Sequence, residues 1–198
     1  MIDHEALIGF CRDVAPRCPV VIDEAYYELL PDYQRMTLSP LVREGLDVIV
    51  ARTFSKVYGM AGLRIGYILA RPERVKQLYS LTTTSRNQPG YRAALVSLGD
   101  LEYLQAAQTY LTQCREKIYR VCETHQLKYL KSVGTFVYVD TERPALAMRD
   151  ALARHAVDIR VFDDARYPGW IRIGTATPAE LDMLAEALPK ALAEVRML

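Results

Sequence analysis

The apolar positions of the first 75 residues follow two rhythms, one typical of amphipathic helices and one typical of short buried strands. Apolar residues recur at helical spacing over residues 5–14, and Pro16 ends this pattern. Pro72 and Glu73 begin a later helix. Three short, continuous apolar runs each predict a strand buried on both faces: residues 19–23, 47–51 and 67–70. Such alternation of helices and strands predicts part of a parallel α/β sheet.

The remainder of the chain begins with a long helical stretch. Residues 91–125 keep one apolar stripe, with Asp100 as a cap or a kink, and this helix is expected to connect two domains. Thr177 and Glu180 form a capping box before a final helix, which Pro189 is expected to bend. Four strands and one helix are predicted between these helices, in this order: strands at 127–130 and 135–139, a helix at 145–155, and strands at 158–162 and 170–173.

These elements predict an α/β protein with two domains. The expected boundaries are 1–90 for the first domain, 91–125 for the connecting helix region and 126–198 for a small C-terminal α/β domain. A parallel sheet of only two or three strands leaves edges and faces uncovered. The first domain is therefore expected to be incomplete.

Charge and composition narrow the range of partners. The 25 Lys and Arg residues balance 24 Asp and Glu residues, so the net charge of +1 provides no global field for binding nucleic acid. No apolar run approaches the roughly 20 residues that span a bilayer, and the first residues lack the segments of a signal peptide. We therefore expect a cytoplasmic protein that binds neither nucleic acid nor a membrane.

The cysteine and histidine residues do not predict a metal site. The three histidines are scattered, and no pair of cysteines has the two-to-four-residue spacing of a metal knuckle. Reduced and mostly buried thiols are expected at all four cysteines: Cys11, Cys18, Cys114 and Cys122.

Polar residues that could support catalysis follow the first two predicted strands. In an open α/β sheet, ligands bind outside the carboxyl ends of the strands. Six residues are expected to cluster there: Asp23, Glu24, Tyr26, Thr53, Ser55 and Lys56. A lysine beside hydroxyl groups either binds a phosphate, forms a Schiff base or lies on the surface without a chemical role.

Three kinds of active site contain residues of these types. A P-loop ATPase would use the acidic end of the strand at 19–23, but the required G-x-x-x-x-G-K-[ST] loop does not occur in the sequence. A penicillin-binding enzyme would use residues 53–56, but its companion motifs are also missing. A pyridoxal phosphate site needs a lysine, an aspartate for the ring nitrogen, and cationic and hydroxyl groups for the phosphate. The sequence contains all of these groups.

The chain resembles the C-terminal half of a fold-type I pyridoxal phosphate-dependent aminotransferase and is most similar to histidinol-phosphate aminotransferases. Four motifs carry the resemblance, which covers essentially the whole chain: Asp23-Glu-Ala-Tyr26, Thr53-Phe-Ser-Lys56, Gly62-Leu-Arg64-Ile-Gly66-Tyr67 and Trp170-Ile-Arg172-Ile-Gly174-Thr175. It implies the C-terminal part of a three-layer α/β/α large domain, followed by a small α/β domain. It also implies pyridoxal 5'-phosphate as cofactor and a homodimer. The implied substrates are a 2-oxo acid as acceptor and, as donor, either an amino acid or a histidinol phosphate-like amine.

The resemblance assigns three residues to the reactive end of the cofactor. Lys56 would be the Schiff-base lysine, and it would also move the proton between the α-carbon of the substrate and the cofactor. Asp23 would pair with the protonated pyridine nitrogen and keep the ring able to accept electrons. Tyr26 would donate a hydrogen bond to the 3' oxygen of the ring.

Four further residues receive roles in anion binding from the same resemblance. Arg64 would bind the cofactor phosphate through two hydrogen bonds, assisted by the hydroxyl groups of Thr53 and Ser55. Arg172 would hold the α-carboxylate of the amino acid, since a planar guanidinium matches a carboxylate. Closure of the small domain would then align the substrate and exclude water.

The family pattern also contains parts that this sequence lacks. The resemblance places a phosphate-binding loop, a ring-stacking aromatic residue, a cofactor-binding asparagine and a tyrosine from the partner subunit before residue 1. A truncated gene product, an expressed fragment or a misassigned start is therefore expected. At Gly134-Thr135-Phe136 a threonine stands where the family usually has asparagine, which leaves the substrate open.

Two alternatives to an aminotransferase remain at this stage. The chain could be a catalytically inactive fragment that associates with itself or with another chain through its uncovered apolar faces. It could also keep the cofactor and catalyse a decarboxylation, as relatives of threonine-phosphate decarboxylase do.

Overall fold

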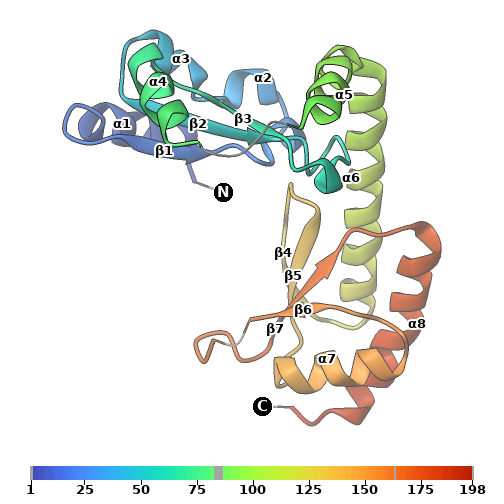
Figure 1. The fold of residues 1–198 in the computed structure, drawn as a ribbon. Helices are drawn as coiled ribbons and strands as arrows, with labels where there is room; N and C mark the ends of the chain where they lie inside the picture. Colours follow the sequence, from blue (N-terminus) through green and yellow to red (C-terminus); the bar gives the residue numbers. More distant parts are fainter. Residues whose placement is uncertain (1, 83–86, 163, 198) are drawn as a thin grey trace. The chain divides into compact units, whose positions relative to one another are not determined.

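A computed structural model of the chain describes residues 2–82, 87–162 and 164–197. The chain divides into two compact units, Met1–Gln108 (unit 1) and Thr109–Leu198 (unit 2), and each unit has its own sheet and its own helices (Figure 1). The predicted mixed α/β fold is confirmed. Among the described residues, no helix combines the length and the apolar character that crossing a membrane requires.

Unit 1 contains a three-stranded sheet in the order β1-β2-β3, formed by β1 (Val20–Asp23), β2 (Val48–Thr53) and β3 (Gly66–Leu69). β1 and β2 are parallel, as the sequence predicts, but β3 is antiparallel to β2. The connection at residues 54–65 explains this difference. It contains only the short helix η2 (Ala61–Leu63), whereas a parallel connection usually needs a longer crossover with an α-helix.

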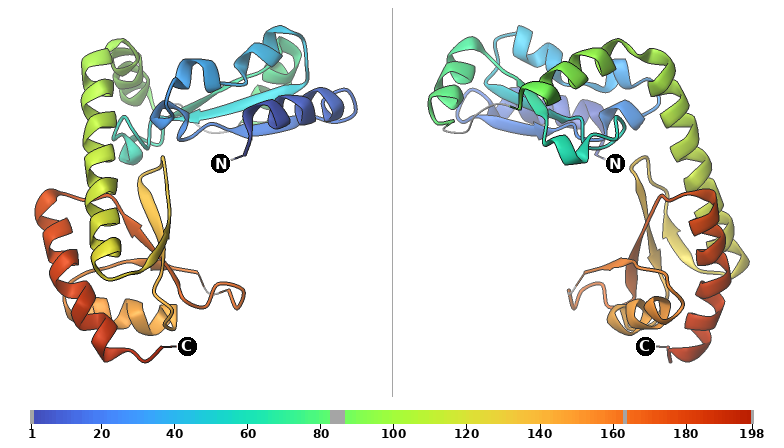
Figure 2. Two further views of the ribbon diagram at one scale, coloured as in Figure 1. Left: turned by 180° about the vertical axis from the view of Figure 1, so that it is seen from behind. Right: turned by 45° about the vertical axis from the view of Figure 1, so that its right-hand side comes forward.

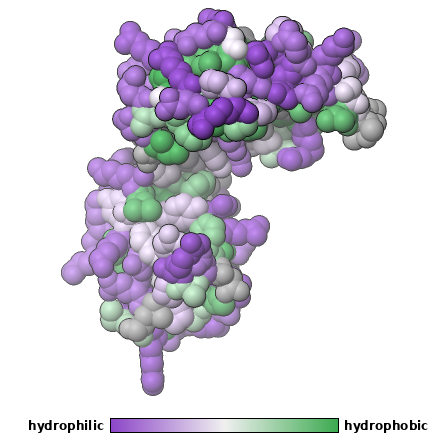
Figure 3. Space-filling model, turned by 90° about the vertical axis from the view of Figure 1, so that its left-hand side faces the viewer, coloured by the Kyte–Doolittle hydropathy of each residue, from purple (hydrophilic) through white to green (hydrophobic). Residues whose placement is uncertain are grey.

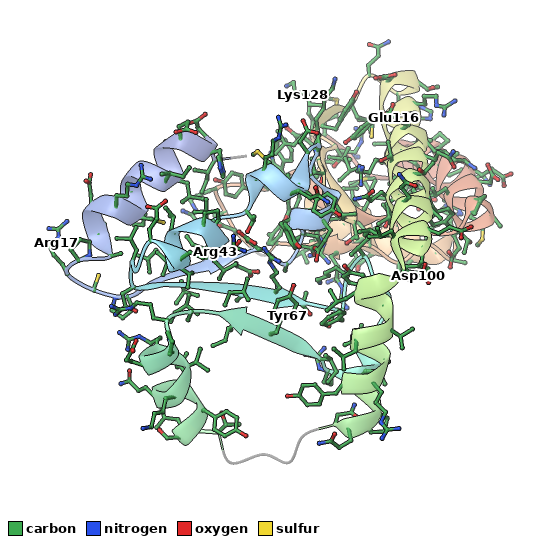
Figure 4. The ribbon with its side chains drawn as sticks, turned by 90° about the horizontal axis from the view of Figure 1, so that it is seen from above. Arg17, Arg43, Tyr67, Asp100, Glu116 and Lys128 are labelled. Atoms are coloured by element: carbon green, nitrogen blue, oxygen red, sulfur yellow. The ribbon has the colours of Figure 1, made fainter. Side chains whose placement is uncertain are left out.

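Helices lie on both faces of this sheet. Unit 1 contains α1 (His4–Val14), η1 (Tyr27–Leu29), α2 (Tyr33–Met36), α3 (Ser39–Arg43), α4 (Pro72–Ser80) and α5 (Gln88–Gly99). Figure 4 shows α1 and α3 on one face and α4 and α5 on the other. Cys11 of α1 and Leu41 of α3 pack with Val20, Val48 and Val50, and these buried side chains form the core of the unit. Val20 of β1 and Val48 and Val50 of β2 therefore form the face of the sheet that receives α1.

The predicted long helix is divided into two helices at Asp100. α5 ends at Gly99 and α6 (Leu101–Thr124) begins one residue later, with Asp100 labelled at the junction in Figure 4. The Asp100 carboxylate accepts a hydrogen bond from the backbone nitrogen of Tyr103 (2.9 Å), so Asp100 caps the start of α6. α6 crosses the boundary between the two units in the sequence.

Unit 2 contains a four-stranded antiparallel sheet packed on helices (Figure 2). Its strands, in the order β4-β5-β7-β6, are β4 (Lys128–Leu130), β5 (Phe136–Asp140), β7 (Trp170–Gly174) and β6 (Arg160–Val161). Its helices are α7 (Ala145–Arg154) and α8 (Pro178–Glu194), which pack with the second half of α6 around a core centred on Ile118, Leu152 and Leu188. The predicted capping box of Thr177 and Glu180 is confirmed at the start of α8.

The surface of unit 1 combines polar side chains with exposed apolar ones. Polar residues cover most of the face of this unit that Figure 3 shows, with apolar side chains between them. Val21 on β1 and Leu95 and Val96 on α5 are 65%, 71% and 74% exposed. In the described part of the chain, β1 and β3 each pair only with β2, so both outer edges of the sheet have free backbone groups.

The cysteines agree with the expectation of reduced and mostly buried thiols. All four are free; Cys11, Cys114 and Cys122 are buried, and Cys18 is exposed. Across residues 2–82, 87–162 and 164–197, no group of three or more His, Cys, Asp and Glu side chains is arranged to hold a metal ion.

Candidate active site

Lys56 lies in a tight loop that follows the carboxyl end of β2. Phe54, Val57 and Tyr58 are buried on either side of it, whereas Lys56 itself is exposed. The backbone nitrogen of Met60 donates to the carbonyl of Phe54 (2.9 Å), and that of Gly59 donates to the carbonyl of Lys56 (2.9 Å). These contacts close the loop on a buried apolar base and direct the lysine toward solvent.

Tyr26 is the residue that the structure brings to Lys56. The Lys56 amine lies 5.2 Å from the centre of the Tyr26 ring, although the two residues belong to segments that follow different strands. An ammonium group over an aromatic face is attracted by the ring electrons. The predicted proximity of the first and second motifs is thus present between these two side chains.

Asp23 ends β1 beside this pair in the sequence and presents an exposed carboxylate. One carboxylate oxygen accepts a hydrogen bond from the backbone nitrogen of Ala25 (2.9 Å), which fixes the turn leading to Tyr26. Asp23 stands opposite Ala51 in the parallel ladder, two residues before Thr53. Residues two apart on a strand share a face, so Asp23 and Thr53 belong to the same face of the sheet.

Glu24 does not join this group, contrary to the expected cluster of six polar residues. It is only 6% exposed and it binds Arg52 from the other face of the sheet. The physical reason is the period of two in a β-strand, which directs consecutive side chains to opposite faces. Position at a strand end alone does not distinguish Asp23 from Glu24, whereas the alternation of faces does.

Thr53 and Ser55 are held by local hydrogen bonds. The Thr53 hydroxyl lies 3.4 Å from the carbonyl of Ile65, to which it donates, and it accepts a hydrogen bond from the backbone nitrogen of Ser55 (3.1 Å). The start of β3 also lies very close to the backbone of β2. A Cβ atom at Gly66 would lie 2.7 Å from the backbone oxygen of Arg52, so the third motif requires glycine at this position.

Arg64 has a left-handed backbone conformation with φ of 52°, which is uncommon for a residue other than glycine. Its neighbours hold it there: Asn87 donates a hydrogen bond to the carbonyl of Leu63 (2.9 Å), and Ile65 packs where a Cβ of Gly90 would otherwise lie. The guanidinium is exposed and donates to the carbonyl of Ala61 (3.1 Å). Among the described residues, no carboxylate forms an ion pair with Arg64.

Arg64 also lines a groove with a volume of about 960 Å³. The groove runs along β3 between α4 and α5 and is lined further by Asn87 and Tyr91. Asp23, Tyr26 and Lys56 are not among its lining residues. The structure therefore brings Lys56 and Tyr26 together directly, and it places Arg64 at a groove beside β3.

Arg172 lies on the open face of the sheet in unit 2. Its guanidinium carbon lies 4.8 Å from the centre of the Phe136 ring, and its register partner on β5 is Tyr138. Tyr138 in turn packs against Phe162, with ring centres 5.4 Å apart. Aromatic side chains of β5 thus lie beside this arginine, and Phe162, which follows β6, packs on one of them.

Arg160 is a residue that the sequence analysis missed. It is the direct register partner of Arg172 across β6 and β7, so both guanidinium groups project from the same face. Like charges directly opposite each other on a sheet are unfavourable. In the described part of the chain neither arginine forms an ion pair with a carboxylate. The strand pairing of 158–162 with 170–173 was the information needed to find this pair.

Glu28 is a second residue without a predicted role. Its side chain is 2% exposed, and burial raises its pKa to about 7, with Arg52 opposing the shift and Glu24 adding to it. A carboxyl group with this pKa changes its charge near neutral pH. It lies in η1, directly after the segment that contains Asp23 and Tyr26.

The side chains of unit 1 fit the chemical groups of pyridoxal phosphate, the cofactor that the resemblance implies. The molecule presents an aldehyde, a pyridine nitrogen, a phenolic oxygen and a phosphate. The partners available for these groups are the Lys56 amine, the Asp23 carboxylate, the Tyr26 phenol and the Arg64 guanidinium. Within the described residues, neither Lys56 nor Asp23 takes part in an ion pair, so both charges remain available.

Comparison with known proteins places this geometry in context. The family model for aminotransferase class I and II matches residues 6–188. A histidinol-phosphate aminotransferase of Symbiobacterium thermophilum is 36% identical over 182 residues, which cover 91% of this chain and 50% of the relative. The chain thus spans about half the length of the curated relatives it matches.

Solved structures support the same fold. A histidinol-phosphate aminotransferase from Sinorhizobium meliloti, in complex with pyridoxal-5'-phosphate, has a TM-score of 0.85 and 34% identity, and the match covers 96% of this chain and 53% of that chain. An L-threonine-O-3-phosphate decarboxylase from Porphyromonas gingivalis has a TM-score of 0.79 at 20% identity, covers 98% and 60%, and shares the fold alone. The expected α/β fold of the fold-type I enzymes is confirmed.

The raised pKa of Glu28 predicts how stability depends on pH. Because its folded pKa of about 7 lies above the ordinary value of 4.5, the neutral carboxyl stabilises the fold fully below about pH 4.5. This contribution is lost as the pH rises through about 7. Glu28→Gln is expected to remove the decline, which amounts to roughly 3 kcal/mol in the free energy of unfolding for a shift of this size.

Urea unfolding followed by far-UV circular dichroism between pH 4 and 8 measures this difference. Glu44→Gln is the matched control, because Glu44 is an exposed carboxylate of the same unit. An equal decline in stability for the wild type and Glu28→Gln would show that Glu28 does not titrate in this way.

Proposed function

The chain belongs to the aminotransferase class I and II family, and from this we propose that it binds pyridoxal 5'-phosphate at Lys56 and takes part in amino-group transfer from an amino acid to a 2-oxo acid. Amino-group transfer is preferred to decarboxylation because relatives with more than 30% identity are histidinol-phosphate aminotransferases. The decarboxylase at 20% identity supports only the shared fold.

The contact of Lys56 with Tyr26 is the observation that carries this proposal. The Lys56 amine lies 5.2 Å from the Tyr26 ring centre, at the edge of the sheet where Asp23 ends β1. An amine, a phenol and a carboxylate from two neighbouring strand ends match the aldehyde, the phenolic oxygen and the ring nitrogen of one small molecule. A surface lysine without a chemical role would need neither the phenol nor the carboxylate beside it.

Each side chain then has a defined task. Bound pyridoxal phosphate supplies an electron-accepting ring. Asp23 would hold a proton on the ring nitrogen by charge pairing, and Tyr26 would donate a hydrogen bond to the phenolic oxygen. Lys56 would hold the cofactor at its aldehyde carbon, with loss of water, and its free amine would remove and return the proton at the substrate α-carbon.

Phosphate binding is assigned to Arg64, with the hydroxyl groups of Thr53 and Ser55. The exposed guanidinium of Arg64 donates one hydrogen bond to the carbonyl of Ala61. A guanidinium has five N–H donors, so enough remain for two hydrogen bonds to a phosphate. The left-handed backbone of Arg64 supports a functional constraint at this position.

The substrate proposed for unit 2 is an anionic amine or amino acid. Arg172 is assigned to its α-carboxylate, and the facing Arg160 supports a second anionic group such as a carboxylate or a phosphate. An anion between two arginines would offset their mutual repulsion. The rings of Phe136 and Tyr138 supply an apolar wall beside it.

A homodimer is proposed as the working state of the protein. Val21, Leu95 and Val96 in unit 1 are large apolar side chains with more than half of their surface exposed, which supports burial against a second chain. Light scattering of the purified chain is expected to give twice the mass of one chain. A monomer at all tested concentrations would contradict this assignment.

Covalent labelling tests the cofactor site. The purified chain is mixed with pyridoxal phosphate, reduced with borohydride and mapped by mass spectrometry. One adduct per chain is expected at Lys56, because its amine is exposed beside Tyr26 and Asp23. Lys56→Ala is expected to abolish this adduct, and Arg64→Ala to weaken cofactor retention by roughly tenfold or more, the effect of losing charged hydrogen bonds.

Lys76→Ala is the matched control, since Lys76 lies on α4 of the same unit. Labelling spread evenly over the lysines, or labelling that survives in Lys56→Ala, would contradict the proposal.

Amino-acid binding tests the two arginines of unit 2. Arg172→Ala is expected to raise the dissociation constant of every amino acid by roughly tenfold or more, because the α-carboxylate loses charged hydrogen bonds. Arg160→Gln is expected to weaken the binding of glutamate and to leave the binding of alanine unchanged, since only glutamate has a second carboxylate. Isothermal titration calorimetry with the purified chain measures these dissociation constants. Unchanged affinity after Arg172→Ala would refute its role.

A further inference from the structure

We propose that Arg52 is the positioning residue of this site: it fixes the strand ends that carry Asp23 and Lys56, from the opposite face of the sheet. The inference rests on the proposed function of Lys56 and adds a residue that the family motifs quoted above do not include. Arg52 lies on β2, four residues before Lys56, and its side chain is 10% exposed.

The Arg52 guanidinium contacts four separate segments of unit 1. Nε donates to the Glu24 carboxylate (2.9 Å), and one terminal nitrogen donates to the Thr37 hydroxyl (2.6 Å). The other terminal nitrogen donates to the hydroxyl groups of Tyr27 (2.9 Å) and Tyr67 (3.2 Å). These partners lie in four segments of the chain. Glu24 follows β1, Thr37 precedes α3, Tyr27 begins η1 and Tyr67 lies in β3.

Glu24 completes this network from the adjacent strand. Its carboxylate accepts hydrogen bonds from Arg52, from the Thr37 hydroxyl and from the backbone nitrogen of Leu38 (2.7 Å). The backbone nitrogen of Glu24 donates to the carbonyl of Ala51 (2.9 Å), which extends the ladder between β1 and β2 by one residue. Both the side chain and the backbone of Glu24 therefore hold the end of β1 to β2.

The network determines where the candidate site residues lie because they are the sequence neighbours of its members. Asp23 precedes Glu24, and Thr53 follows Arg52, so each functional residue projects from the face opposite its neighbour. Tyr67 stands directly across from Arg52 in the β2–β3 ladder, which places the start of β3 under the same control. Movement of Glu24 or Arg52 would therefore move Asp23 and the loop that contains Lys56.

Arginine is the residue type that this task requires. Its planar group directs five N–H donors along fixed directions, while a lysine amine is a single point charge on a flexible stem. The Arg52 guanidinium carbon also lies 3.8 Å from the centre of the Tyr27 ring, so it stacks on one tyrosine while it binds its neighbours. Lysine at position 52 would keep the charge and lose the simultaneous contacts.

A contribution to stability alone does not account for the pair. Replacing both partners of a buried ion pair by uncharged residues is often neutral or stabilising, because both charges must be removed from water. The specific property of this pair is that it joins four segments at defined angles. Loss of the pair is therefore expected to disorder the strand ends more than it lowers the overall stability.

Two variants separate positioning from stability. Arg52→Lys keeps the charge opposite Glu24, and the double variant Glu24→Gln with Arg52→Gln leaves no unpaired buried charge. Arg12→Gln is the matched control, because it removes an arginine–glutamate pair of the same unit that is exposed. Hydrogen–deuterium exchange without cofactor and borohydride labelling with pyridoxal phosphate are measured for each protein.

In both Arg52 variants, the exchange rate of amides at the strand ends, such as Glu24 and Phe54, is expected to rise about tenfold, as for loss of one charged hydrogen bond. Exchange within α1 should change less than about twofold, and labelling at Lys56 should fall at least about fivefold, as expected for a misplaced amine. The Arg12→Gln control should match the wild type in both measurements.

Three results would contradict either the positioning role of Arg52 or the proposed cofactor site at Lys56. Equal exchange increases throughout unit 1 would mean that Arg52 only stabilises the fold, and wild-type labelling of Lys56 in Arg52→Lys would mean that it does not position the lysine. Either result overturns the inference. Absence of Lys56 labelling in the wild type would instead overturn the proposed function, while the exchange measurement would still decide whether Arg52 orders the strand ends.

Discussion

Side chains of consecutive residues on a β-strand project to opposite faces of the sheet, and the candidate site depends on this constraint. At the carboxyl ends of β1 and β2, one face presents Asp23 and Thr53, while the other buries Glu24 and Arg52. A functional residue and a residue that holds the strand in place thus occupy neighbouring positions. The parallel pairing of β1 with β2 brings both kinds of residue together at one edge of the sheet.

The buried face has an electrostatic cost that the exposed face does not have. Burial alone would lower the pKa of Arg52, but the hydrogen bond to Tyr67, the tyrosines and Glu24 raise it above the ordinary value. Burial raises the pKa of Glu28 to about 7, because Arg52 only partly offsets the effect of burial. Arg52 therefore stays charged, whereas the carboxyl group of Glu28 changes its charge near neutral pH. Asp23 and Lys56, in contrast, are exposed and available to a ligand.

Local sequence signals predicted most of the fold, because they depend on residues close together in the chain. The three apolar runs of unit 1 became strands, Asp100 became the cap that separates α5 from α6, and Thr177 began α8. The antiparallel direction of β3 was not predicted, since it depends on the path of the connection at 54–65. The pairing of Arg160 with Arg172 was missed because it follows from strand register, which a single sequence does not specify. The burial of Glu24 was missed although the alternation of faces along β1 separates it from Asp23.

The central claim is that the exposed face of β1 and β2 binds pyridoxal phosphate, while the residues of the buried face hold the two strand ends in position. A crystal structure of the purified chain grown with pyridoxal phosphate tests this claim most directly. The account predicts continuous electron density from the Lys56 amine to the cofactor, with the Asp23 carboxylate at the ring nitrogen and Glu24 still bound to Arg52. A cofactor bound elsewhere, or bound at Lys56 with Asp23 directed away from the ring, would contradict it.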